Sequence, residues 1–376
     1  MKKTLYVLLS ILLLCGCTKQ EGTCSSHDRP VRLSEYLYEV TYTDYDAIAG
    51  ERYARTLDNV SRGAACTVVR KGDFVGRNYD YLYSDMAEFV IHVPAKEGRY
   101  ASIGVAASIF ELTPEVTEKD PYGQYFDVLP FVTVDGMNEK GVYCSVNMVR
   151  GEFGYRTTGT NPGAGKTLYL SFVVRYVLDN FATAREACEA LEDVNIVFLE
   201  ALGELHFFVA DREESWVVEV FDNKLKCMKV KEEVMTNFYL LTDDFINNRK
   251  TDAQPEGIER YNYVLENIEG FNSFDAAAKL MSELRYSKTY DLTNEPFWYS
   301  EYYGDECTAG VIDANMPKEQ YAEYLREECE GFKTKKRDYL SGYWVTTHTS
   351  VYDLKDLTLR VYSQENFSEH FDFSLK

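Results

Sequence analysis

The chain has 376 residues, of which 45% are hydrophobic and 27% charged, so it can bury a large core in one or two domains. Its formal net charge of −21 argues against nucleic acid and anionic lipid as partners, because both are bound through basic surfaces. We therefore expect an ordinary globular protein with a solvated acidic surface.

Residues 1–17 have the pattern of a targeting segment. Two lysines precede an apolar run over residues 5–14, and a run of this length is too short to span a bilayer, which takes about 20 residues. The run ends in the sequence LCGC, which resembles a bacterial lipoprotein box with Cys17 as the lipidated residue. We predict an exported cell-envelope lipoprotein that reaches the membrane through its lipid anchor. The alternative is an ordinary secretory signal with incidental cysteines.

The segment 18–65 separates this signal from the rest of the chain. Residues 18 to about 30 are small and polar, which predicts a tether. Apolar side chains then recur at helical spacing from Tyr45 to Val60, which predicts an amphipathic helix over about 45–60. We interpret 18–65 as a tether and pro-segment ahead of a catalytic domain over 66–376.

Residues 66–80 predict a β-hairpin. Thr67, Val68 and Val69 favour a strand, Gly72-Asp73 suits a two-residue turn, and the strand restarts at Phe74. This turn sets the register. It pairs Lys71 with Phe74, Val69 with Gly76, Val68 with Arg77 and Cys66 with Tyr79.

The hairpin places two reactive side chains on one face and a third on the neighbouring strand. Arg77 lies diagonal to Cys66 on one face, and a thiol beside a guanidinium is a candidate nucleophile with a lowered pKa. Asp80 would point to the opposite face of an ideal strand, so it needs a bulge or the strand end to join them. The alternative is an inert buried cysteine and a surface arginine.

The remaining chain alternates strands with a few helices. Loops are expected over 111–125 and 151–165, the second as a candidate lid. Helices are predicted over 168–180, 183–191, 256–268 and 273–284. Strands are predicted over 89–93, 101–109, 131–134, 142–149, 205–210, 215–221, 224–230, 308–313, 343–347, 349–353 and 357–362. Strand runs flanking paired helices predict an α+β fold with two packed sheets and helices outside.

Cys66-Thr67 followed by Gly76-Arg77-Asn78-x-Asp80 resembles the start of mature choloylglycine hydrolases, penicillin V acylases and acid ceramidase-like amidases. The resemblance recurs at residues 135–141 (DGMNEKG) and 350–353 (SVYD). These enzymes are N-terminal-nucleophile hydrolases. The resemblance implies their four-layer αββα sandwich, with Cys66 exposed by self-cleavage.

The resemblance also implies roles for the site residues. Cys66 would attack an amide carbonyl to form an acyl-thioester, with its own α-amine as base, Arg77 supporting the thiolate and Asp80 orienting the ammonium. Asn147 matches the family's oxyanion asparagine, Asn237 its second active-site asparagine, and Arg260 a helix arginine that braces the site. Taken singly, the last three could be a strand cap, a turn residue and a solvated charge.

Cysteines and histidines outside the hairpin predict neither a metal site nor a cofactor. The remaining cysteines form no CxxC pair and the five histidines show no ligand spacing, so we expect mostly isolated thiols. His348, in a threonine-rich stretch, is interpreted as a structural residue.

Together these features predict an exported hydrolase of linear amide C–N bonds in small N-acyl compounds. The candidate substrates are conjugated bile acids, N-acyl amines or amino acids, and phenoxymethylpenicillin. The alternatives are acyl transfer to an amine and a non-catalytic lipid-anchored binding protein. The expected protein partner is either the retained pro-segment or a second copy of the chain.

Overall fold

The structure, a computed structural model, describes nine stretches of the chain. They are residues 25–45, 66–82, 87–106, 112–149, 159–197, 204–221, 224–240, 257–286 and 344–376. The signal sequence with Cys17, the helix predicted over 45–60 (apart from Tyr45) and the strand predicted over 308–313 lie outside the described residues. The same holds for most of the loop at 151–165. None of the described helices is long and apolar enough to cross a membrane.

A six-stranded antiparallel sheet contains the predicted hairpin. Its strand order is β15-β4-β5-β16-β17-β18. The strands are β4 (Cys66–Lys71), β5 (Phe74–Leu82), β15 (Val234–Met235), β16 (Trp344–Asp353), β17 (Thr358–Ser363) and β18 (Phe371–Ser374). The predicted register between β4 and β5 is confirmed at all four pairs, from Lys71 with Phe74 to Cys66 with Tyr79. Gly72 takes a φ of +61° in the turn, a conformation that glycine adopts without a steric cost.

A ten-stranded sheet packs against this one. Its order is β1-β3-β6-β7-β8-β9-β12-β13-β14, with β2 also paired to β3. The N-terminal strands are β1 (Ser26–His27), β2 (Val31–Arg32) and β3 (Leu37–Asp44). The others are β6 (Glu88–Val93), β7 (Ser102–Ala106), β8 (Thr133–Asn138), β9 (Tyr143–Val149), β12 (Glu204–Ala210), β13 (Ser215–Phe221) and β14 (Lys224–Lys229).

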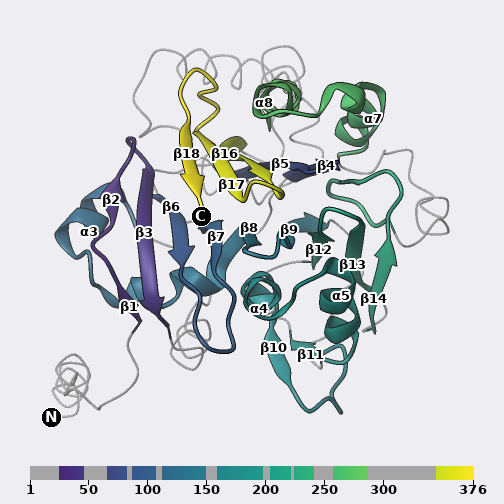
Figure 1. Cartoon of the computed structure of the whole chain (residues 1–376), viewed down its shortest axis with the longest axis horizontal. Helices are drawn as coiled ribbons and strands as arrows, with labels where there is room; N and C mark the ends of the chain where they lie inside the picture. The colour runs from purple at the N-terminus through teal and green to yellow at the C-terminus, as the bar shows by residue number, and fades with distance from the viewer. Residues whose placement is uncertain are drawn as a thin grey trace, which may run out of the picture.

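Helices cover the outer face of each sheet (Figure 1). α4 (Val173–Asn180) and α5 (Ala184–Glu192) lie on the ten-stranded sheet, whereas α7 (Ile258–Asn267) and α8 (Phe274–Glu283) lie on the six-stranded sheet. Three apolar clusters separate the four layers. In the middle one, side chains from both sheets interdigitate, among them Val68, Val75, Ile103, Phe208 and Tyr352. The predicted four-layer αββα sandwich is therefore confirmed.

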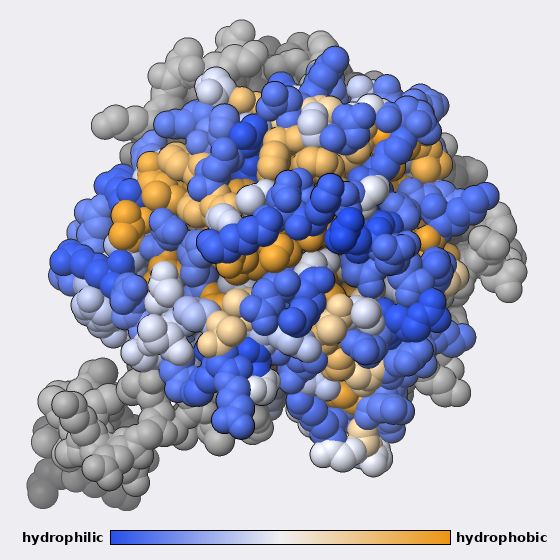
Figure 2. Space-filling model, viewed as in Figure 1, coloured by the Kyte–Doolittle hydropathy of each residue, from blue (hydrophilic) through white to orange (hydrophobic). Residues whose placement is uncertain are grey.

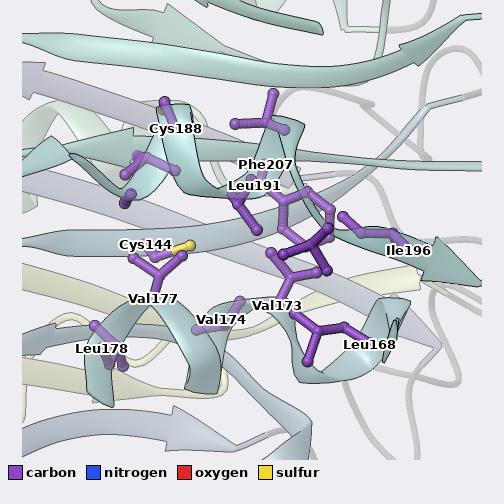
Figure 3. Packing of buried hydrophobic residues seen from close by; sticks show 14 of the residues in the cluster. Cys144, Leu168, Val173, Val174, Val177, Leu178, Cys188, Leu191, Ile196 and Phe207 are labelled. Atoms are coloured by element: carbon purple, nitrogen blue, oxygen red, sulfur yellow. The ribbon is translucent and has the colours of Figure 1, made fainter. Parts of the chain in front are cut away.

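The outer clusters show why these helices form where they do. Figure 3 shows Val173 and Val177 of α4 and Leu191 of α5 converging on Cys144 and Phe207 of the sheet. Each helix thus buries one apolar stripe, which is what stabilises a short helix in water. The face of the molecule in Figure 2 is largely hydrophilic with small apolar patches, in keeping with the net charge of −21.

The N-terminal segment differs most from its prediction. The tether predicted to about residue 30 is wrong from Ser26 onward, because β1 and β2 both pair with β3. β3 itself runs parallel to β6, with Leu37, Tyr38, Val40 and Tyr42 buried. Tyrosines and single valines alternate with polar residues here, so the segment has strand periodicity that the small-residue composition of its start obscured.

Smaller differences follow from tertiary context. The loop predicted over 111–125 contains α3 (Pro114–Lys119), which Thr113 caps and where proline occupies the first turn. The helix predicted over 168–180 begins later, because Thr167–Tyr169 form strand β10, paired in parallel with β11 (Asn195–Val197). The strands predicted over 343–347 and 349–353 are one strand, β16. Four 3₁₀ turns complete the described elements: η1 (Gln124–Asp127), η2 (Leu129–Val132), η3 (Leu170–Phe172) and η4 (Ile268–Gly270).

We predict that Gly104→Ala destabilises the protein by about 1–3 kcal/mol. Gly104 faces Gly136 across β7 and β8, and a Cβ on Gly104 would lie 2.4 Å from the backbone carbonyl oxygen of Asp135. Urea denaturation measures the loss. Gly270→Ala is the control, since its Cβ would meet no atom within 4 Å. Equal stability of the two variants would contradict the close approach of these strands.

Candidate active site

Cys66 begins β4 and is buried between the two sheets. Its side chain packs with Tyr79 of the neighbouring strand and with Val134 and Val146 of the ten-stranded sheet. Because side chains alternate along β4, Thr67 points to the opposite face, toward α7. The sulfur and the backbone nitrogen of Cys66 therefore meet two different sets of residues.

The sulfur lies beside Arg77. Arg77 Nη2 is 3.6 Å from Cys66 Sγ, and the same nitrogen donates to the carbonyl oxygen of Val146. Arg77 Nη1 donates to Asp135 Oδ2 at 2.7 Å. Arg77 and Asp135 are fully buried, so this ion pair joins the two sheets in a region that excludes water. The predicted proximity of Arg77 to Cys66 is confirmed.

The nitrogen of Cys66 is held by Asn237 and Arg260. Cys66 N donates to Asn237 Oδ1 at 2.8 Å, and Arg260 Nη2 donates to the same oxygen at 2.7 Å. Asn237 Nδ2 in turn donates to the carbonyl oxygen of Met148 at 2.8 Å. Arg260 also donates to Thr67 Oγ1 at 2.8 Å. The structure thus brings Asn237 and Arg260 to the position expected for a site that holds the cysteine nitrogen.

Asp80 joins this cluster from the outer face of the sheet. Its Oδ2 lies 3.4 Å from Arg260 Nη1, and its Oδ1 accepts a hydrogen bond from Thr346 Oγ1 at 2.5 Å. A bulge is present in the neighbouring strand, because β16 pairs Thr346 with Asp80 and His348 with Tyr79, leaving one extra residue between them. It does not turn Asp80 to the face of Cys66 and Arg77, so the expectation that a bulge joins the three side chains on one face is wrong. The nitrogen of Cys66 donates to Asn237 and not to Asp80. Asp80 is connected to that nitrogen only through Arg260, which contacts both Asp80 and Asn237.

Asn147 lies next to the cluster. Its Nδ2 is 3.2 Å from the carbonyl oxygen of Thr236 and 3.4 Å from that of Met235, while its Oδ1 is buried without a partner among the described residues. An oxyanion donor needs a free N–H. The structure thus places Asn147 beside the backbone that carries Asn237, with its Nδ2 near two carbonyl oxygens.

Burial sets the pKa of two groups in this uncut chain. It raises the pKa of the Cys66 thiol to about 11, against the opposing effect of Arg77. Burial also raises the pKa of Asp80 to about 7, although Arg260 and Thr346 act to lower it. The expectation of a lowered pKa for Cys66 is wrong for this state, because one nearby guanidinium does not offset complete loss of water.

A second group of polar residues, around His348 and Asp135, adjoins the site through Arg77. His348 Nδ1 lies 3.0 Å from Glu88 Oε1, and its Nε2 lies 3.0 Å from Asp135 Oδ2. Burial acts to lower the pKa of His348, but these two carboxylates raise it to about 9. Burial alone would raise the pKa of Asp135, yet Arg77 and His348 hold it well below its usual range. The 135–141 motif was the signal in the sequence that pointed to Asp135.

His206 supports the opposite side of the site. Its Nε2 lies 2.9 Å from the carbonyl oxygen of Thr236, which can only accept, so this nitrogen carries the hydrogen. Its Nδ1 lies 3.1 Å from Glu219 Oε1, which also accepts from Leu240 N at 2.9 Å. The His206–Glu219 pair therefore fixes the backbone that carries Asn237.

Metal-ligating residues do not cluster in the part of the chain that the structure describes: no three His, Cys, Asp or Glu side chains could jointly hold an ion there. Four described cysteines are free thiols, Cys66, Cys144, Cys188 and Cys227. The expectation of isolated thiols is confirmed for these four; Cys227 Sγ donates to the backbone carbonyl oxygen of Cys188 at 3.2 Å.

Residues 70–251 match the profile of the linear amide C–N hydrolases, choloylglycine hydrolase family. The resemblance to this family is confirmed. A bile salt hydrolase/transferase from Lactiplantibacillus plantarum is 27% identical over 190 residues, which are 46% of this chain and 52% of that protein. The match thus spans about half the length of this curated relative.

Solved structures of such enzymes resemble the chain at low identity. A mutant of the conjugated bile acid hydrolase from Clostridium perfringens is 17% identical, with a TM-score of 0.45 over 83% of this chain and 92% of its own. The penicillin V acylase from Agrobacterium tumefaciens is 16% identical, with a TM-score of 0.41 over 82% of this chain and 86% of its own.

We predict that the free energy of unfolding falls as pH rises from about 6.5 to 9 because of His348. Across this range the folded protein keeps a proton on His348 that the unfolded chain releases. The contribution of His348 to the free energy of unfolding is therefore fully present below pH 6.5 and is lost as pH rises to about 9. The loss amounts to roughly 3 kcal/mol for this shift. Urea denaturation of the Cys66→Ala chain at several pH values measures it.

The slope should be smaller in the same chain carrying His348→Gln. His92→Gln is the control, because the pKa of His92 is lowered by burial and its titration lies below this range. An identical slope in the presence and absence of the His348 imidazole would contradict the assignment of a charge to it.

Proposed function

We propose that this protein hydrolyses a linear amide C–N bond in a small N-acyl compound, with Cys66 as the nucleophile after cleavage of the 65–66 bond. The observation that carries the proposal is the hydrogen bond from Cys66 N to Asn237 Oδ1, beside a sulfur that faces Arg77. A site that holds both the nitrogen and the sulfur of one cysteine suits a residue that supplies its own base. The family match supports the reaction class.

Cleavage would change the chemistry of Cys66. Its nitrogen becomes an α-amine with an ordinary pKa of about 7.7–8.0, able to take the proton from the thiol of the same residue. The resulting ammonium can donate to Asn237 Oδ1, and its positive charge favours the ionised form of Asp80.

The proposed reaction then proceeds in two halves. The thiolate attacks the amide carbonyl carbon, and the negative oxygen that forms accepts hydrogen bonds, with Asn147 Nδ2 as a candidate donor. The C–N bond breaks as the ammonium of Cys66 gives its proton to the leaving amine. Water, deprotonated by the same amine, attacks the thioester and releases the acid and the thiol.

Replacing Cys66 with alanine should abolish amide hydrolysis while leaving the protein folded. The assay is a panel of glycine- and taurine-conjugated bile acids, N-acyl amines and penicillin V, followed by release of the free amine. Cys188→Ala is the matched control, because Cys188 is equally buried but lies on α5. Undiminished turnover by Cys66→Ala would refute the mechanism.

The same panel tests the acyl acceptor. A thioester can be intercepted by an amine in place of water, and the relative from L. plantarum is described as a hydrolase/transferase. Adding glycine or taurine and measuring new conjugates separates the two reactions. An intact protein mass with no cut before Cys66 would instead support a non-catalytic, lipid-anchored binding protein.

We further propose that the segment ahead of Cys66 stays bound after the cut. β3 pairs with β6 over five register positions, and Leu37, Tyr38, Val40 and Tyr42 are buried against it. Each such side chain stabilises the contact by roughly 1.5–3 kcal/mol. Tyr42 Oη also donates to the carbonyl oxygen of Phe126 at 2.7 Å. If Cys17 carries a lipid, this segment holds the catalytic chain at the membrane.

Native mass spectrometry of the cut protein should therefore detect both fragments together. Tyr42→Ala should weaken their association by about 10²-fold or more, since large-to-small changes in a core cost about 3–5 kcal/mol. Thr43→Ala on the same strand is the control, because Thr43 is exposed. Finding the fragment that starts at Cys66 alone in solution would show that the segment is not retained.

A further inference from the structure

Five charged or ionisable side chains form a chain of contacts that ends at the cysteine sulfur. From the far end they are Glu88 on β6, His348 on β16, Asp135 on β8, Arg77 on β5 and Cys66 on β4. All five are buried, Glu88 the least so, with 4% of its surface exposed. The contacts cross repeatedly between the two sheets, because β6 and β8 belong to one and the other three strands to the other.

Asp135 is the branch point of this chain. Its Oδ2 accepts from Arg77 Nη1 at 2.7 Å and also lies 3.0 Å from His348 Nε2. Its Oδ1 accepts from Ser350 Oγ at 2.8 Å and from the hydroxyl of Tyr352. Two cations thus share one carboxylate oxygen. Whatever charge His348 carries decides how strongly Asp135 holds Arg77.

His348 faces acceptors on both ring nitrogens. An ionised carboxylate can only accept, so contacts to Glu88 and to Asp135 require hydrogen on Nδ1 and on Nε2, which is the imidazolium form. Among the described residues Tyr79 also lies against the ring, and its own ring stacks on it with centroids 5.2 Å apart. The hydroxyl of Thr347 also donates to Glu88 Oε1, at 2.5 Å.

We propose that His348, paired with Glu88, is a positioning residue whose positive charge offsets Asp135, so that the Arg77 guanidinium remains available to stabilise the Cys66 thiolate. Were His348 neutral, Asp135 would neutralise Arg77, and the buried sulfur would face a pair with no net charge. Glu88 keeps the proton on His348 from the side away from the reaction. This role rests on the proposed function of Cys66, but it is measured separately.

The test is the pH dependence of Cys66 alkylation by iodoacetamide in the purified full chain. Mass spectrometry of the unaltered protein first shows whether a fragment starting at Cys66 forms and reacts, which is the outcome that the proposed function requires. His348→Gln should then raise the pH midpoint of alkylation by about one unit, so that the rate at neutral pH falls roughly tenfold. His92→Gln, on β6 and paired with Glu39, should leave the midpoint unchanged.

Two further variants separate charge from packing. Glu88→Gln keeps an oxygen acceptor for Nδ1 but removes the carboxylate that holds the proton on His348, so it should raise the midpoint, as His348→Gln does. The double variant Glu88→Gln/His348→Gln should have the midpoint of His348→Gln alone, because Glu88 acts through the charge on His348. A double variant displaced further than His348→Gln, or a His348→Gln that slows the reaction without moving the midpoint, would overturn the proposal. If His348→Gln does not fold, an unchanged midpoint in Glu88→Gln overturns it equally.

Discussion

The ion pair between Arg77 and Asp135 is the interaction on which the site depends. Moving two charges out of water costs several kcal/mol for each ion, and their attraction offsets that only with close geometry and further hydrogen bonds. Both conditions are met, because Asp135 accepts from four groups and Arg77 from the other sheet reaches it at 2.7 Å. The pair therefore fixes the two sheets at one distance and register. Cys66 lies on β4, the strand next to β5 and Arg77, so the same packing sets its position between the sheets.

The sulfur and the backbone nitrogen of Cys66 contact different residues because of the pleat of β4. Between the sheets, Arg77 contacts the sulfur and is itself paired with Asp135. On the outer face, Asn237 accepts from the nitrogen, and Arg260 links Asn237 to Asp80. A strand alternates its side chains, so only a residue at the strand's first position offers both its sulfur and its backbone nitrogen in this way. The bulge of β16 opposite Tyr79 then brings Thr346 to Asp80.

The local pattern of the sequence predicted the hairpin part of this site, and the family resemblance pointed to Asn147, Asn237 and Arg260. The hairpin register was predictable residue by residue, because a two-residue turn and period-two alternation leave one pairing. The chain of contacts through His348 was not, since Asp135 and His348 are 213 residues apart and meet only when the two sheets pack. The raised pKa of Cys66 could not be foreseen either, because burial is a property of the packed layers. Strand β3 was not predicted because its parallel partner, β6, follows it in the sequence only after the whole β4–β5 hairpin.

The parallel pairing of β3 with β6 has a consequence for how such a protein is made. In the intact chain β3 reaches the sheet as part of one molecule, so the encounter is intramolecular and independent of concentration. If the chain is cut before Cys66 as proposed, the same contact would become an association of two molecules, and stability would depend on the concentration of each fragment. If a cut protein unfolded at low concentration, its two fragments would separate and would rarely meet again. The ten-stranded sheet would then fold once in each molecule, while the chain is still intact and before the proposed cut makes it active.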